Sequence, residues 1–75
     1  MRVDASTLLV EAAGRHRVGV GDVVGRGGGD AVRRARREAM AEVRRRLAYS
    51  YRRIGQLFDE RSAEAVRRIL KKYAA

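Results

Sequence analysis

The sequence has no cysteine and a single histidine, His16. Without cysteine the chain forms neither a disulfide framework nor a thiolate metal site, and one histidine supplies too few ligands for a metal ion. We expect His16 to lie in a loop or on the surface with its ring hydrogen-bonded. No carboxylate pair, nucleophile–base pair or metal-ligand cluster is visible either. We therefore predict that the protein is not an enzyme and uses no metal or cofactor.

Long apolar runs are also missing. No run approaches the roughly 18 residues that a membrane span requires, and the N-terminus lacks the long apolar core of a signal peptide. We therefore expect a cytoplasmic protein with no membrane association. The 75 residues allow one small domain with a modest core, and no internal repeat is present.

Basic residues are abundant and unevenly distributed. Lysine and arginine total 18 against nine acidic residues, which gives a net charge of +9, and 16 of the 18 are arginine. In residues 1–30 four arginines balance four acids, so the whole excess lies in residues 31–75. A surplus of one sign in one part of a small domain favours an extended anionic partner such as nucleic acid.

Apolar periodicity predicts an all-α fold of about five helices and no sheet. The first helix should follow an N-cap at Asp4 or Ser6 and stop near Gly14. Residues 21–24 are expected to form a one-turn helix whose Val23 and Val24 fill the core. A brief strand over residues 18–21 is the alternative, but nothing else in the chain is suited to pair with it.

The clearest periodic segment predicts a long helix over residues 31–48, with Asp30 as its N-cap. The glycine-rich loop before it, residues 25–30, lacks the Lys-Ser/Thr of a phosphate-binding loop and is not preceded by a strand, so we do not expect nucleotide binding there. The apolar stripe of the helix consists of Val32, Ala35, Ala39, Val43 and Leu47. Arg33, Arg37 and Arg44 are expected on its outer, solvated face.

Two shorter helices are predicted after it, over residues 50–58 and 62–73, with Ser50 and Ser62 as N-caps. The second has an apolar face of Val66, Ile69, Leu70 and Tyr73. Its other face carries Arg67, Arg68, Lys71 and Lys72. A short helix, a tight turn and a basic amphipathic helix form the pattern of a helix-turn-helix, although a helical hairpin with a solvated basic face has the same pattern.

Three segments carry a resemblance to a known family. LLVEAAGRHRVGVGDVVGR at residues 8–26 is similar to an opening helix, a VAxxxxVxxxDLL-type segment and a basic loop. ARREAM at residues 35–40 and SYRRIGQLF at residues 50–58 are similar to ARQxAM and SLPEIGxxF. Together they resemble the C-terminal DNA-binding domain of the bacterial chromosomal replication initiator DnaA. The resemblance implies a helix-turn-helix linked to replication initiation. Some bacterial transposases of the REP-associated type carry a similar module, which makes transposition the other setting.

The family signature at the start of the recognition helix is substituted. Where the family has GRDHTTV or GRDHSTV, this chain has ERSAEAV at residues 60–66. Arg61 and Val66 fit the pattern, and the turn glycine of the family falls at Asp59 or Glu60. The Asp-His-Thr-Thr positions are Ser62, Ala63, Glu64 and Ala65. Because two of these are alanines, which offer at most a methyl contact, we expect weak or no preference for the initiator's binding box.

The expected partner is double-stranded DNA, with the helix at residues 62–73 in the major groove. The resemblance implies DNA-side roles for Arg26, Arg36, Arg61 and the pair Lys71–Lys72. The complete set of predicted DNA-side residues is Arg26, Arg36, Arg61, Ser62, Glu64, Arg67, Arg68, Lys71 and Lys72. Arginine can contact guanine O6 and N7, and a glutamate can accept from a cytosine amino group. Glu64 has a second interpretation, because an acid in the first turn of a helix stabilises the helix dipole.

Two other functions fit parts of the pattern. The loss of signature residues favours a protein-interaction module that docks on a larger replication or transposition protein, whereas the charge argues against it. Structured-RNA binding fits the charge equally well. It lacks the stacking aromatics of single-strand readers, because only Tyr49 and Tyr51 remain outside the expected core. The sequence predicts neither a target sequence nor an oligomeric state.

Overall fold

The computed structural model describes residues 3–74 of the chain. They form five α-helices: α1 (Ala5–Arg15), α2 (Val20–Val24), α3 (Asp30–Leu47), α4 (Tyr51–Leu57) and α5 (Ala63–Ala74). No strand occurs in this range, so the predicted all-α fold of about five helices is confirmed. Within the same residues, none of the helices combines the length and the hydropathy that crossing a bilayer requires.

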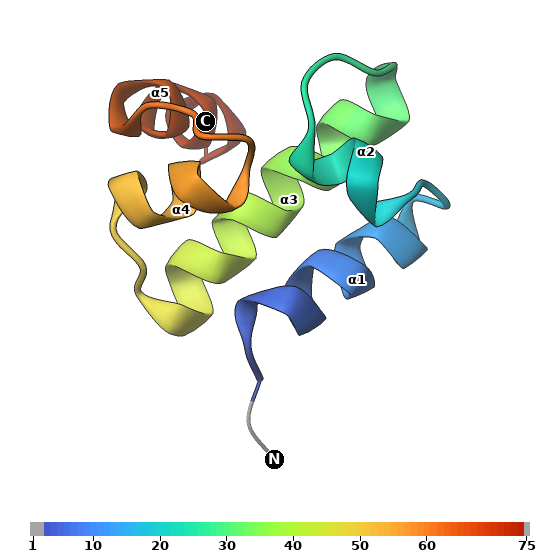
Figure 1. The fold of residues 1–75 in the computed structure, drawn as a ribbon, viewed down its shortest axis with the longest axis horizontal. Coiled ribbons are helices and arrows are strands. Elements are labelled where there is room, and N and C mark those ends of the chain that lie inside the picture. Colours follow the sequence, from blue (N-terminus) through green and yellow to red (C-terminus); the bar gives the residue numbers. More distant parts are fainter. Residues whose placement is uncertain (1–2, 75) are drawn as a thin grey trace.

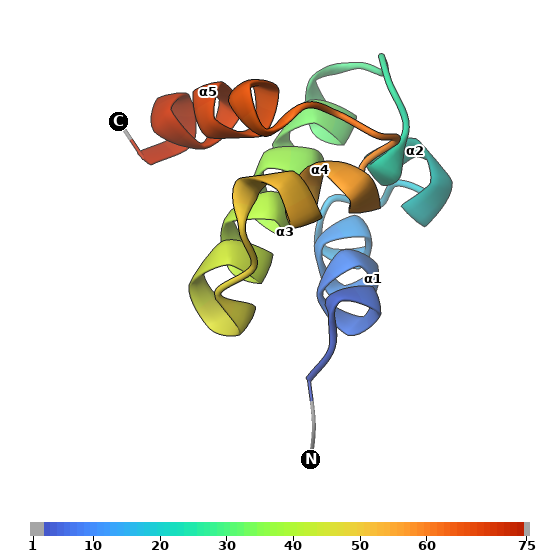
Figure 2. The same cartoon turned by 60° about the vertical axis from the view of Figure 1, so that its left-hand side comes forward.

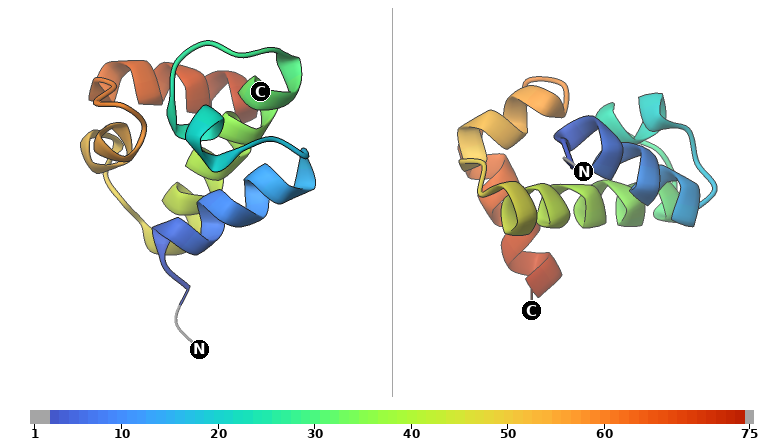
Figure 3. Two further views of the ribbon diagram at one scale, coloured as in Figure 1. Left: turned by 45° about the vertical axis from the view of Figure 1, so that its right-hand side comes forward. Right: turned by 90° about the horizontal axis from the view of Figure 1, so that it is seen from below.

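Helix α3 lies at the centre and contacts each of the other four (Figure 1). Helices α1 and α2 pack on one side of it, and α4 and α5 lie on the other. Figure 2 shows α5 crossing above α3 and α4, with its C-terminal end pointing away from the rest of the chain. In Figure 3, α1 runs beside α3 while α5 projects from the opposite side. Helix α5 therefore has its outer side turned away from the other helices.

The core forms along the length of α3. The largest fully buried side chains of this core come from all five helices and the residue after α4: Leu8, Val23, Met40, Val43, Ile54, Phe58 and Val66. Small buried residues, Ala12 of α1 with Ala35 and Ala39 of α3, let these two helices approach closely. The expectation that Val23 and Val24 fill the core is confirmed for Val23, which is fully buried, whereas Val24 is half-buried and packs against the core from outside. The expected apolar role of Tyr73 lies outside the described side chains.

Side-chain caps begin three of the helices at the expected places. Asp4 Oδ1 accepts a hydrogen bond from the Thr7 N–H at 2.9 Å, and Ser50 Oγ and Ser62 Oγ accept from N–H groups three residues ahead at 3.1 Å each. The prediction that Asp30 caps α3 is wrong. Gly29 occupies the cap position, and Asp30, the first helical residue, instead accepts from the Arg33 side chain at 2.7 Å. Asp30 still benefits from the positive end of the helix dipole.

Gly55 permits the turn between α4 and α5 to fold back over α4. Its carbonyl accepts hydrogen bonds from the N–H groups of Phe58 at 3.1 Å and Arg61 at 2.9 Å. A Cβ atom on Gly55 would lie 1.9 Å from the Arg61 carbonyl oxygen, far inside van der Waals contact. Asp59 and Glu60 close the turn in the left-handed region, with φ of 59° and 54°. The turn glycine implied by the resemblance thus falls on residues that do adopt a positive φ.

We predict that Gly55→Ala lowers the free energy of unfolding by about 2–3 kcal/mol, because the added methyl group pushes against backbone rather than a movable side chain. Gly14→Ala is the matched control. Gly14 lies inside α1 with open space around it, so its substitution should stabilise the fold by about 0.5–1 kcal/mol. Urea unfolding followed by circular dichroism measures both. Equal effects of the two substitutions would contradict the close crossing at Gly55.

Candidate nucleic-acid interface

Helix α5 exposes a strongly basic face. Val66 is buried and Ile69 and Leu70 are half-buried, which anchors the helix on α3 and α4. The exposed charged residues of the helix are Glu64, Arg67, Arg68, Lys71 and Lys72. At 100° per residue, Glu64, Arg68 and Lys71 point most directly away from the core, with Arg67 and Lys72 on opposite flanks. These five charged side chains form an exposed row along α5, here called the charged ridge.

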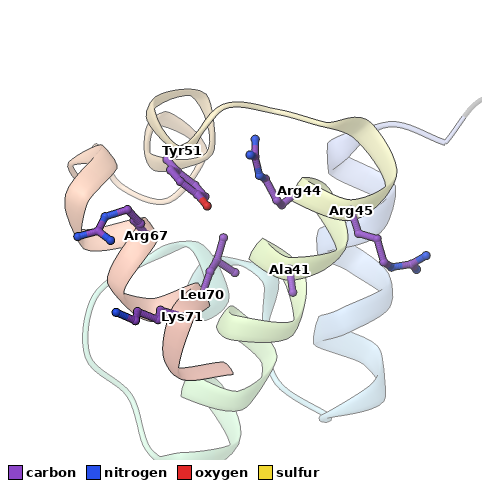
Figure 4. Close-up of a pocket in the computed structure, with 7 residues that line it drawn as sticks. All are labelled: Ala41, Arg44, Arg45, Tyr51, Arg67, Leu70 and Lys71. Atoms are coloured by element: carbon purple, nitrogen blue, oxygen red, sulfur yellow. The ribbon is translucent and has the colours of Figure 1, made fainter. Parts of the chain in front are cut away.

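A groove runs along one flank of α5, where it faces the C-terminal half of α3 (Figure 4). This groove, here the Tyr51 groove, has a volume of about 470 Å³ and is lined by Ala41, Arg44, Arg45, Tyr51, Arg67, Leu70 and Lys71. In Figure 4 Tyr51 and Leu70 point into the space between the helices, while Arg45, Arg67 and Lys71 extend outward. The Arg44 guanidinium stacks 4.6 Å from the centroid of the Tyr51 ring. The groove thus has an apolar floor and a basic rim.

A second cavity lies on the other flank of α5, against the N-terminal half of α3. This cavity, here the arginine cleft, has a volume of about 400 Å³ and is lined by Asp30, Arg33, Arg36, Arg37, Arg61, Ile69 and Lys72. Five of these seven side chains are basic and one is acidic. The two cavities place a basic surface on each side of the exposed ridge of α5.

Arg36 was expected to face DNA, but the structure places it inside the fold. The side chain is only 6% exposed, and its guanidinium donates hydrogen bonds at 2.9 Å to the carbonyl oxygens of Val23, Asp22 and Gly27. Burial lowers the pKa of the guanidinium, and the nearby charge of Arg33 lowers it further. Two of these acceptors belong to α2 and the third to the glycine-rich loop after it, so Arg36 fastens both segments to α3.

Arg61 also acts mainly within the fold. Its guanidinium donates to the carbonyl oxygens of Phe58 and Gly25, both at 2.9 Å, and so joins the α4–α5 turn to the loop after α2. Burial, followed by the charges of Arg36 and Arg26, lowers its pKa. Arg61 is half-buried and lines the arginine cleft, so part of it still faces the cavity.

The remaining predicted residues are exposed, but several are engaged by neighbours. Arg26 Nε lies 2.7 Å from Asp59 Oδ2, an ion pair that ties the glycine-rich loop to the α4–α5 turn. Glu64 forms an ion pair with Arg67, and hydrogen bonding from Arg67 lowers the pKa of the Glu64 carboxyl. Ser62 is an N-cap. Among the predicted residues, only those of α5 form a continuous row at the surface. Arg26 is held near the start of α5 by its ion pair with Asp59 in the α4–α5 turn.

Sequence reasoning missed the contribution of α3. Arg33 and Arg44 are exposed as expected and Arg37 is half-buried, and the structure brings all three beside α5 as walls of the two cavities. Their spacing of four and seven residues put them on one stripe, but only the crossing of α5 over α3 shows which partner that stripe faces. Residues 3–74 bring together no three His, Asp or Glu side chains in a group that would hold a metal ion.

Comparison of the chain with protein-family models, curated proteins and solved structures finds no match.

We predict that Arg36→Ala lowers the free energy of unfolding by about 2–4 kcal/mol, because three carbonyl groups lose a charged donor. Arg34→Ala is the matched control: it removes the same charge from an exposed position of α3, and its effect should stay within about 0.5 kcal/mol. Thermal and urea unfolding measure both variants. If Arg36→Ala were as stable as Arg34→Ala, the guanidinium would not be holding the loop.

Proposed function

We propose that the protein is a duplex-DNA-binding module that places α5 in the major groove. The observation that carries this proposal is the exposed, basic α5 with a basic cavity on each flank. The major groove admits one α-helix and is bordered by two phosphate backbones, so a helix seated in it needs cations on both sides. The α3 arginines of the Tyr51 groove would contact one phosphate backbone. The α3 arginines of the arginine cleft would contact the other.

The setting we propose is replication initiation or transposition. It rests on the likeness of residues 35–40 and 50–58 to the initiator's DNA-binding domain, and Gly55 gives that likeness a physical basis, since this glycine permits the tight turn. Most contacts in the proposed complex are to phosphate, because only Glu64, Arg68 and Lys71 lie on the outermost line of α5. Phosphate contacts position a protein without reading sequence. Discrimination for the initiator's box should therefore be weak.

A protein-docking function is the second candidate, and the apolar floor of the Tyr51 groove favours it. Leu70 and Tyr51 would contact an apolar side chain of a partner, and the rim would contact acidic residues. This function and DNA binding differ in their dependence on salt, which the next experiment measures.

Affinity for duplex DNA should fall steeply with salt. If about five phosphates are neutralised, the logarithm of the association constant should fall with the logarithm of salt concentration with a slope of about −4 to −5. Fluorescence anisotropy with a labelled duplex measures the slope. Arg67→Ala, a change on the flank of α5, should weaken binding to a box-containing and a scrambled duplex by similar factors and reduce the slope by about 1. A slope near zero, or no binding at low salt, would favour protein docking.

Glu64→Gln should strengthen binding to every duplex about twofold to fivefold. The substitution removes a carboxylate that faces the polyanion and releases Arg67 from an exposed ion pair, which itself contributes little to stability. Glu11→Gln is the matched control, because Glu11 is an exposed acid on α1, far from α5 in the fold. Weaker binding confined to sequences with cytosine at one position would instead show that Glu64 contacts a base.

A further inference from the structure

The arginine cleft holds more positive charge than its own structure balances. Arg33, Arg36, Arg37, Arg61 and Lys72 line it, and the single lining carboxylate, Asp30, is already paired with Arg33 at 2.7 Å. Like charges this close repel one another, and burial makes the repulsion stronger because water screens it less.

Arg37 adds a second, independent observation. Its Nε atom is buried and has no hydrogen-bond partner among the described residues. Buried guanidinium N–H groups almost always have an acceptor, since leaving one without costs about 1–3 kcal/mol. Because Arg37 lines the cleft, an anion bound there would offer this guanidinium an acceptor once the side chain turns toward the cavity.

The donors come from three parts of the fold. Arg33 and Arg37 belong to α3, Arg61 to the α4–α5 turn and Lys72 to α5. A ligand that satisfies donors from three directions needs several acceptor oxygens arranged around one centre. A phosphate group has this form, whereas a carboxylate presents two oxygens in one plane. The volume of about 400 Å³ is ample for one such group.

We propose that the arginine cleft binds one phosphate group, and that the bound group stabilises the docking of the α4–α5 turn on the α2–α3 loop. Arg61 links these two segments through the Gly25 carbonyl, Arg36 holds the loop to α3 through the Gly27 carbonyl, and both line the cleft. An anion there offsets the repulsion between the two guanidinium groups. The phosphate comes either from a DNA backbone, in which case this inference rests on the proposed function, or from a free phosphate ion.

Thermal unfolding in inorganic phosphate tests the site without DNA. Compared with sodium chloride at matched ionic strength, phosphate at about ten times its dissociation constant should raise the Tm of the wild-type chain by about 5–10 °C. Arg37→Ala should lose most of this shift, and Arg34→Ala, which removes a charge outside the cleft, should keep it. Lys72→Ala, an exposed position on α5, gives an independent second variant if Arg37→Ala folds poorly.

The general salting-out effect of phosphate acts on all variants alike, so only the difference between them reports on the cleft. Arg37→Lys separates charge from shape, because lysine keeps the charge but loses the planar fork, and it should recover only part of the shift. If phosphate raises the Tm of Arg37→Ala and Lys72→Ala as much as that of Arg34→Ala, the site does not exist. The same conclusion follows if phosphate leaves the wild-type Tm unchanged.

A duplex with single neutral methylphosphonate linkages distinguishes the two sources of phosphate. If the cleft holds a backbone phosphate, neutralising one position should weaken wild-type binding about tenfold and leave Arg37→Ala binding unaffected. Phosphate-dependent stability without any duplex binding would support a free-anion site and overturn the proposed function. Salt-dependent duplex binding that Arg37→Ala and Arg34→Ala weaken equally would leave the proposed function standing and overturn the phosphate site.

Discussion

Two guanidinium groups hold together the parts of this chain that have the least apolar contact. The loop between α2 and α3 is rich in glycine, so it has backbone carbonyls but almost no side chains with which to join the core. Arg36 donates to the loop carbonyl of Gly27 and to the carbonyls of Asp22 and Val23 at the end of α2, and Arg61 links Gly25 to the turn before α5. A domain this small buries too little apolar surface to fix every loop by packing alone. Hydrogen bonds from charged side chains therefore hold these loops in place, which in a larger domain is done by packing against the core.

The position of α5 depends on backbone as much as on packing. Because Gly55 has no side chain, the turn passes directly over α4, and its path sets the direction in which α5 leaves. Asp59 and Glu60 adopt the left-handed conformation, which costs a residue with a Cβ about 1–2 kcal/mol. The Gly55 carbonyl and the Arg26–Asp59 ion pair offset part of that cost. The ridge and its two flanking cavities are a consequence of this turn.

The helices were predictable from the sequence because their signals are local. Apolar periodicity and the serine caps place α3, α4 and α5 within a residue or two of their true ends, and the one-turn α2 was expected for lack of a strand partner. The roles of the arginines were not predictable. Arg33, Arg36 and Arg37 lie within one turn or so of α3 and all line the arginine cleft, yet Arg33 is exposed, Arg37 is half-buried and Arg36 is buried. That division depends on where the α2–α3 loop and α5 cross the helix, and a pattern of charges contains no such information.

The formal charge of +9 overstates the positive charge that is free to bind an anion. Five arginines pair with carboxylates on the surface, and Arg36 and Arg61 donate to backbone carbonyls. An exposed ion pair contributes at most about 1 kcal/mol, so a phosphate displaces the carboxylate at little cost, but the displaced acid then faces the same polyanion. The arginines that hold backbone carbonyls have no such freedom. In the proposed complex, binding strength and its salt dependence therefore follow the cations of α5 and the rims of its two cavities, and not the composition of the whole chain.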